Sequence, residues 1–76
     1  MIDYTRVGER IKDIRNLAQV TQLELATKLG VSVGYVCKLE KGLVKFGLDQ
    51  AQKVSLVFRC NISWLLWGDD TQVWQA

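Results

Sequence analysis

Lysines are concentrated in the middle of the 76-residue chain, where they could bind phosphate groups. Four lysines lie between residues 28 and 45, against Glu40 as the single acidic residue of that stretch. From residue 6 to 59 the chain has ten basic and five acidic residues, which gives +5, although the whole chain carries only +2. This local excess is compatible with a phosphate-facing surface, although a lysine-bearing face exposed to solvent is the commoner cause.

The residue types that most enzymes and metal sites need are scarce. The chain has no histidine, which removes the usual general base and the common nucleophile triads. Cys37 and Cys60 form no CxxC pattern and are too few for a disulfide framework or a structural zinc site. Asp69 and Asp70 are adjacent in a polar tail and do not indicate a convergent site. We therefore expect no enzyme activity, no metal and no cofactor.

The elements that must position the lysines are predicted to be helices. Apolar residues recur at intervals of three and four, and no segment alternates like a strand. Because the chain has no proline, glycines and capping residues must mark the helix ends. Thr21 and Glu24 form a capping box, and Ser32 and Asn61 are expected to cap later helices. The five expected helices cover about residues 6–18, 22–29, 32–41, 48–58 and 62–67.

Length and composition limit the organisation of the chain. A chain below about 100 residues cannot enclose a second hydrophobic core, so we expect one all-α domain over residues 1–76. Its core should lie within 6–68, with 69–76 as a polar tail. No window approaches the roughly 18 apolar residues that a membrane span needs, so we expect a cytoplasmic protein.

The most specific pattern is QLELATKLGVSVGYVCKL, which begins at Gln22 and pairs two short helices across a tight turn. Ala26 is small where the helices would cross, and Gly30 falls at the turn. With the flanking LEKG and ISWLLWG, this pattern resembles the helix-turn-helix of the Cro and phage-repressor family, from Val7 to Gly68. The resemblance implies a five-helix lambda-repressor-like DNA-binding domain, prokaryotic or phage-encoded, with its helix-turn-helix at the second and third helices.

The resemblance also implies a set of DNA-binding residues, because in this family the third helix, here 32–41, enters the major groove. The glutamine-rich pattern with which the family contacts bases is missing from this helix. In its place, Val33 would contact a thymine methyl group and Lys38 would donate to guanine. Gly34 suggests close backbone approach or a tolerated imperfection. The expected DNA-binding residues are Gln22, Ser32, Val33, Gly34, Tyr35, Lys38, Lys41 and Lys45. Of these, Gln22, Lys41 and Lys45 are assigned to phosphates, and an expected ion pair of Arg15 with Glu40 is structural.

Apolar residues near the C-terminus predict a second surface. The family binds palindromic operators as dimers, which implies a homodimer of this chain. The expected interface residues are Leu56, Val57, Trp67, Val73 and Trp74, although Trp74 could instead fold back onto its own chain. Two function classes remain open: a transcriptional regulator of double-stranded DNA, such as a Cro-like repressor or compact controller protein, and a protein-interaction module, such as an antitoxin, that binds a protein partner through this surface.

Overall fold

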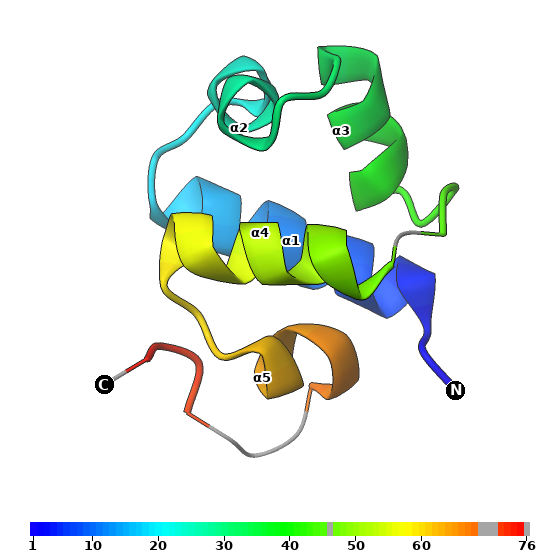
Figure 1. The fold of residues 1–76 in the computed structure, drawn as a ribbon, viewed down its shortest axis with the longest axis vertical. Helices are drawn as coiled ribbons and strands as arrows, with labels where there is room; N and C mark the ends of the chain where they lie inside the picture. The colour runs from blue at the N-terminus through cyan, green and yellow to red at the C-terminus, as the bar shows by residue number, and fades with distance from the viewer. Residues whose placement is uncertain (46, 69–71, 76) are drawn as a thin grey trace.

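Five α-helices form the structure, a computed structural model that describes residues 1–45, 47–68 and 72–75. The helices are α1 (Tyr4–Leu17), α2 (Gln22–Leu29), α3 (Val33–Glu40), α4 (Leu48–Phe58) and α5 (Ile62–Trp67) (Figure 1). The predicted all-α, five-helix class is confirmed. The first and third helices differ from their predicted bounds by one or two residues at each end. The first helix begins at Tyr4 because Asp3 accepts hydrogen bonds from the amides of Thr5 and Arg6, and the expected N-cap role of Ser32 is confirmed.

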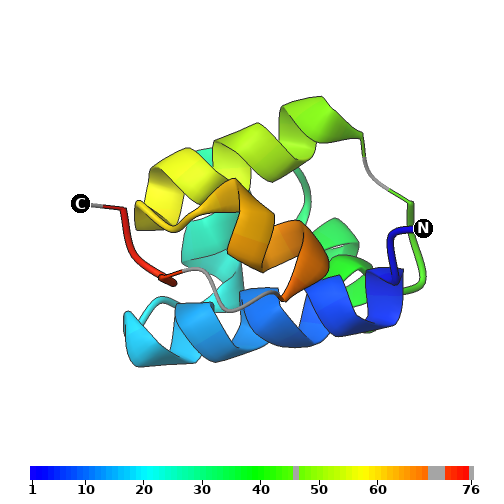
Figure 2. The ribbon, with the colours of Figure 1, turned by 90° about the horizontal axis from the view of Figure 1, so that it is seen from below.

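The helices enclose one apolar cluster, to which all five contribute. Figure 2 shows α1 and α4 along opposite edges of the molecule with α5 in front of the space between them, and Figure 1 shows α2 and α3 on the side away from α5. The largest fully buried side chains are Val7, Ile11, Ile14, Leu25, Leu39, Val36, Val54, Cys60 and Leu65. Among the described residues, no helix combines the length and the apolar character needed to cross a membrane.

The capping box at the start of α2 is complete. Thr21 Oγ1 accepts a hydrogen bond from the Glu24 amide at 3.0 Å, and Glu24 Oε1 accepts one from the Thr21 amide at 3.1 Å. The hydrogen bonds from Thr21 hold the pKa of the Glu24 carboxyl below its usual value, helped slightly by Lys28. The start of α2 is therefore fixed by side chains close in sequence.

We expect Thr21→Ala to lower the free energy of unfolding by about 1 kcal/mol, because the helix loses an N-cap and leaves a backbone amide without its acceptor. Urea unfolding followed by circular dichroism measures the change. Thr27→Ala is a suitable comparison, because the Thr27 hydroxyl only donates to Leu23 O within the same helix. Equal effects of the two substitutions would contradict the capping role.

Two glycines allow the start of α1 to contact the end of α3. A Cβ at Gly8 would lie 2.5 Å from the carbonyl oxygen of Leu39 and 2.6 Å from that of Glu40. Gly42, with φ at +74°, follows α3, and a Cβ there would lie 2.6 Å from the Cα of Thr5. These close backbone contacts fix how the helix-turn-helix sits on the rest of the protein.

The described part of the C-terminal segment, predicted as a polar tail, folds back onto its own chain, which is the alternative left open for Trp74. Asn61 occupies the N-cap position of α5 as predicted, but its side chain makes no cap hydrogen bond. Its Nδ2 donates instead to the carbonyl oxygens of Gln72 and Trp74, while its amide donates to Val73 O at 2.7 Å. Trp74 forms an antiparallel bridge with Cys60. Residues 72–75 therefore lie against the chain that links α4 and α5, and residues 69–71 and 76 are outside the described part.

Candidate nucleic-acid interface

The turn between α2 and α3 is held by local backbone hydrogen bonds. Gly30 adopts a left-handed conformation with φ at +70°, and its amide donates to Thr27 O at 3.2 Å. The next amide, of Val31, donates to Ala26 O at 3.0 Å, and Ser32 Oγ accepts from the Tyr35 amide at 3.1 Å. Because Gly30 ends α2 and Ser32 caps α3 only two residues later, this short turn sets the angle between the two helices.

Apolar contacts hold α3 by one face only. Val36 and Leu39 are fully or almost fully buried, and Ala26 of α2 is 2% exposed, which lets the two helices approach closely. Tyr35, one of the expected DNA-binding residues, is half-buried and packs against the core. The core therefore grips one side of α3 and leaves the other side to solvent.

The exposed side of α3 carries most of the predicted base-contacting residues. Ser32, Val33, Gly34 and Lys38 are all exposed, and Val33 retains 45% of its accessible surface although it is apolar. A Cβ at Gly34 would meet only Ser32 Oγ, at 3.9 Å. Nothing in the described fold therefore requires glycine at this position, whereas Gly8 and Gly42 are required by close packing.

A hydrogen-bonded network lies between α1 and the ends of α2 and α3. Arg15 Nε is 2.6 Å from Glu40 Oε2 and Arg15 Nη2 is 3.2 Å from Glu40 Oε1, so the ion pair is bidentate. The two side chains are only 11% and 3% exposed. Arg15 Nη1 also donates to Val20 O at 2.9 Å, which ties the pair to the segment between α1 and α2. The pair thus joins three parts of the fold.

Gln22 belongs to the same network, which the sequence did not indicate. Its Nε2 donates to Glu40 Oε1 at 3.0 Å, and the side chain is half-buried. Because an amide nitrogen carries two hydrogens, one N–H can remain for an anion at the start of α2. The predicted phosphate contact is therefore held in place by the acid that ends α3.

The remaining predicted cations lie beyond α3. Lys41 is the C-cap of α3, Lys45 lies in the loop that leads to α4, and both are exposed. Arg10 of α1, by contrast, donates from Nη1 to Leu65 O at 3.0 Å, near the C-terminal end of α5. A cation at that end interacts favourably with the helix dipole, so Arg10 has a structural role.

The five predicted dimer residues do not form one group. Leu56 is 73% exposed and Val57 is half-buried, both near the C-terminal end of α4. Val73 and Trp74 lie close to the same end, because their segment pairs with residues 59–61. Trp67, 53% exposed, is at the opposite end of α5. The structure therefore brings four of the five residues together and leaves Trp67 apart.

Comparisons with known proteins agree with this geometry. The model of the helix-turn-helix family HTH_3 matches residues 11–65. An uncharacterized HTH-type transcriptional regulator of Archaeoglobus fulgidus is 38% identical over 65 residues, which cover 86% of this chain and 93% of the relative. The P22 c2 repressor, solved with a synthetic operator, has a TM-score of 0.77 at 27% identity over 83% of this chain and 96% of that one.

A second solved structure gives the same result. SinR, described as the master regulator for biofilm formation and solved in complex with DNA, has a TM-score of 0.71 at 32% identity, covering 78% of this chain and 95% of its own. The resemblance in the sequence is thus confirmed over nearly the whole domain. The chain belongs to the Cro and phage-repressor family of helix-turn-helix transcriptional regulators.

Proposed function

We propose that this protein binds a palindromic operator in double-stranded DNA as a homodimer, with α3 of each copy in the major groove. The observation that carries the proposal is the exposed first turn of α3, where the side chain of Val33 is 45% exposed and the space above Gly34 is open. The Arg15–Glu40 pair holds this helix rigidly from behind. The operator complex of the P22 c2 repressor and the DNA complex of SinR support this assignment.

Specific contacts to bases would come from three residues on α3 and its cap. Lys38 can donate to O6 and N7 of guanine, and Val33 can contact the methyl group of thymine. The hydroxyl of Ser32 accepts from the Tyr35 amide, and it still has a proton to donate to a base or phosphate. Gly34 lets the backbone of α3 approach the base edges closely, because it places no side chain between them.

Phosphate contacts would come from both sides of α3. Gln22 is at the N-terminus of α2, where the helix dipole and the free amides favour an anion. Lys41 and Lys45 would neutralise phosphates from the loop beyond α3, and the Tyr35 hydroxyl would reach another phosphate. These contacts position the protein on DNA and do not select a sequence.

We expect Lys41→Ala and Lys45→Ala to weaken binding to specific and mixed-sequence duplexes equally. Each lost phosphate contact should lower the slope of log K against log salt concentration by roughly 0.9. Fluorescence anisotropy over a salt series measures both effects. Lys12→Ala, an exposed lysine on α1 outside the proposed interface, is the matched control and should retain the wild-type slope. An unchanged slope in the two loop variants would contradict their assignment.

Lys38→Ala should instead relax specificity at one base pair of each half-site. A bidentate contact to guanine is worth about 1–3 kcal/mol of discrimination, so affinity for the operator should fall while affinity for random DNA changes little. Competition between the operator and single-base variants of it measures this discrimination. Equal losses on both kinds of DNA would remove Lys38 from base recognition.

The homodimer is part of the same proposal. Two recognition helices spaced about 34 Å apart would reach successive major grooves on one face of DNA. The apolar surface at the end of α4, with Leu56, Val57, Val73 and Trp74, is the proposed contact, and Trp67 stands apart from it. Because the relative from Archaeoglobus fulgidus is a transcriptional regulator, we assign DNA binding without catalysis. We place the protein in the cytoplasm of a prokaryotic cell, encoded by the cell or by a phage.

The second candidate is a protein-interaction module, such as an antitoxin. It is favoured by one observation: the side chain of Leu56 is 73% exposed on a face that the recognition helix does not use. Retention on mixed-sequence duplex DNA separates the two candidates. A regulator must show salt-dependent retention, whereas a pure interaction module would bind weakly and be indifferent to Lys41 and Lys45.

A further inference from the structure

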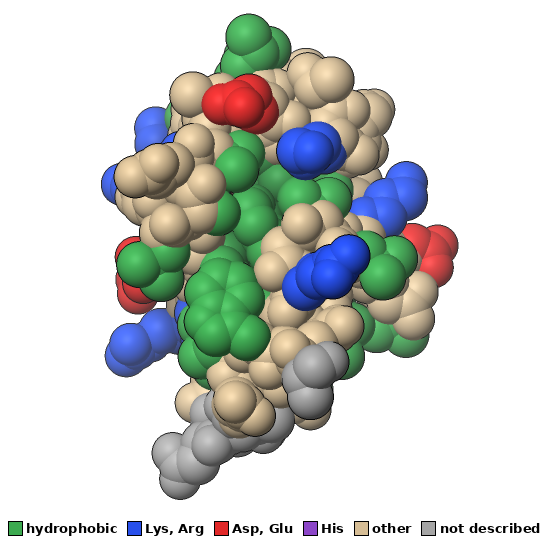
Figure 3. Space-filling view, turned by 90° about the vertical axis from the view of Figure 1, so that its left-hand side faces the viewer, with side chains coloured by type: hydrophobic (Ala, Val, Ile, Leu, Met, Phe, Trp, Pro, Cys, Tyr) green, Lys and Arg blue, Asp and Glu red, His purple; other side chains and the backbone are tan. Residues whose placement is uncertain are grey.

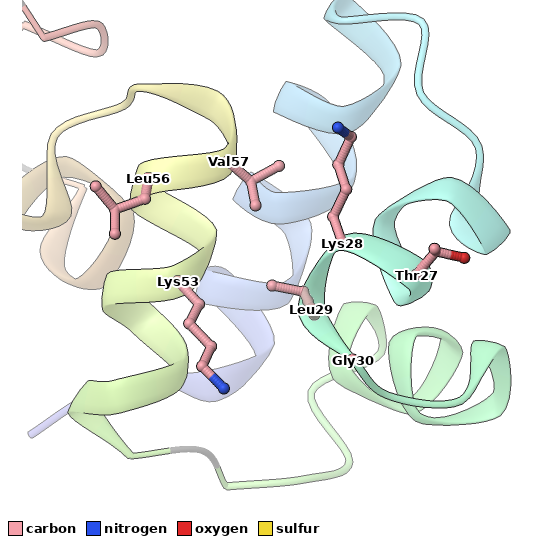
Figure 4. A pocket seen from close by; sticks show the side chains of 7 residues that line it. All are labelled: Thr27, Lys28, Leu29, Gly30, Lys53, Leu56 and Val57. Atoms are coloured by element: carbon pink, nitrogen blue, oxygen red, sulfur yellow. The ribbon is translucent and has the colours of Figure 1, made fainter.

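A shallow groove lies between the C-terminal half of α2 and the last turns of α4. Its volume is about 390 Å³. Leu29, Leu56 and Val57 supply apolar side chains, while Lys28 and Lys53 stand on either side of Leu29 (Figure 4). The lining residues include no Asp or Glu. The groove therefore offers an apolar surface with a positively charged rim.

This groove is separate from the proposed DNA-binding face. The predicted base-contacting side chains are on the exposed side of α3, and none of them lines the groove. Figure 3 shows the side of the molecule on which the groove lies, with apolar side chains through its middle and lysine or arginine side chains beside them. A groove with an exposed leucine fits a protein surface better than a row of phosphates, because phosphates gain nothing from apolar area.

Charge decides which protein surface fits. If the grooves of two copies met directly, Lys28 and Lys53 of both would be brought together, and like charges in an interface disfavour such a pairing. The occupant must therefore carry negative charge beside apolar side chains. An apolar groove with lysines at its edge therefore fits an acidic segment that also carries a large apolar residue.

The sequence of this chain contains such a segment near its C-terminus. The sequence places Asp69 and Asp70 shortly before Val73 and Trp74. Trp74 is 43% exposed although it is a large apolar residue, and its backbone is bridged to Cys60, just beyond the end of α4. Trp74 thus lies at the same end of α4 as Leu56 and Val57 of the groove, and a two-fold dimer that joins two copies at this end would bring each groove to the partner's Trp74.

We infer that each groove of the dimer receives the C-terminal segment, residues 69–75, of the partner copy. The inference rests on the homodimer proposed above and names the surfaces that form it. Trp74 of one copy would cover Leu56 and Val57 of the other, and the partner's aspartates would face Lys28 and Lys53. By two-fold symmetry the same contact occurs twice, so the buried area doubles.

Charge reversal tests this pairing with the intact protein. One variant carries Lys28→Glu with Lys53→Glu, and the other carries Asp69→Lys with Asp70→Lys. In each variant, groove and segment have the same sign, so dimerisation should weaken by about tenfold or more at low salt. When the two variants are mixed, both contacts become complementary, and a heterodimer should form with near wild-type affinity. Sedimentation velocity with one variant fluorescently labelled measures both results.

Controls separate the possible failures. Arg6→Glu with Lys12→Glu makes the same change of charge on exposed positions of α1 and should leave dimerisation unchanged. Leu56→Asp, checked for folding by circular dichroism, should also weaken the dimer. A wild-type protein that stays monomeric would overturn the homodimer itself. A wild-type dimer with unaltered charge-reversal variants, or variants that do not rescue each other, would overturn the groove pairing and leave the homodimer standing.

Discussion

Gly8→Ala is expected to lower the free energy of unfolding by about 3 kcal/mol, the upper part of the range for overpacked cores. The added Cβ would lie 2.5–2.6 Å from two backbone carbonyl oxygens at the end of α3, and backbone cannot turn aside as a flexible side chain can. A domain of this size has about 4–11 kcal/mol of stability in total. The melting temperature, measured by circular dichroism, should therefore fall by more than about 10 °C.

Gly34→Ala is the matched control, because it makes the same substitution inside another helix. Space above Gly34 is open, so alanine should raise the stability by about 1 kcal/mol through its higher helix propensity. The same variant should bind the operator more weakly, because its methyl group separates the backbone of α3 from the bases. Equal stability effects of the two substitutions would contradict the tight contact between α1 and α3.

Breaking the Arg15–Glu40 pair is the second change with a large expected effect. Arg15→Ala should destabilise the protein by about 3–5 kcal/mol, because it leaves the carboxylate of Glu40, 3% exposed, without its cation. Gln22 would remain as a hydrogen-bond donor and cannot neutralise that charge. Chemical denaturation of wild type and variant measures the loss.

Replacing both partners separates the value of the pair from the cost of an isolated charge. Arg15→Met with Glu40→Leu should recover most of the stability lost in Arg15→Ala, because no buried charge is left uncompensated. The Val20 carbonyl and the Gln22 amide would still lose their partners, so recovery should be incomplete. A double variant as unstable as the single one would show that the network stabilises the fold through its own interactions.

Several elements could be predicted because their causes are local in sequence. Thr21 and Glu24 are three residues apart and form the start of α2 by themselves, and Leu48 and Phe58 bound α4 as expected. The HTH spacing around Gly30 is equally local, since the turn needs a left-handed residue at that point. The exposed residues of α3 follow once the buried face is known.

Other features depend on contacts between distant residues, which no local pattern encodes. Gly8 is required by the carbonyl groups of residues more than thirty positions away, and Gln22 bonds to Glu40 across two helices. Asn61 has the residue type of an N-cap, but its side chain donates to the backbone of Gln72 and Trp74 in the C-terminal segment. The position of Trp74 follows from the same long-range pairing.

The central claim, operator binding by two copies, is tested most directly by selecting binding sites from a random duplex pool and measuring the mass of the recovered complex by light scattering. The account predicts a palindromic consensus bound by two chains, with half-sites about one helical turn apart. Recovery of no enriched sequence, or of an asymmetric site bound by a single chain, would contradict it.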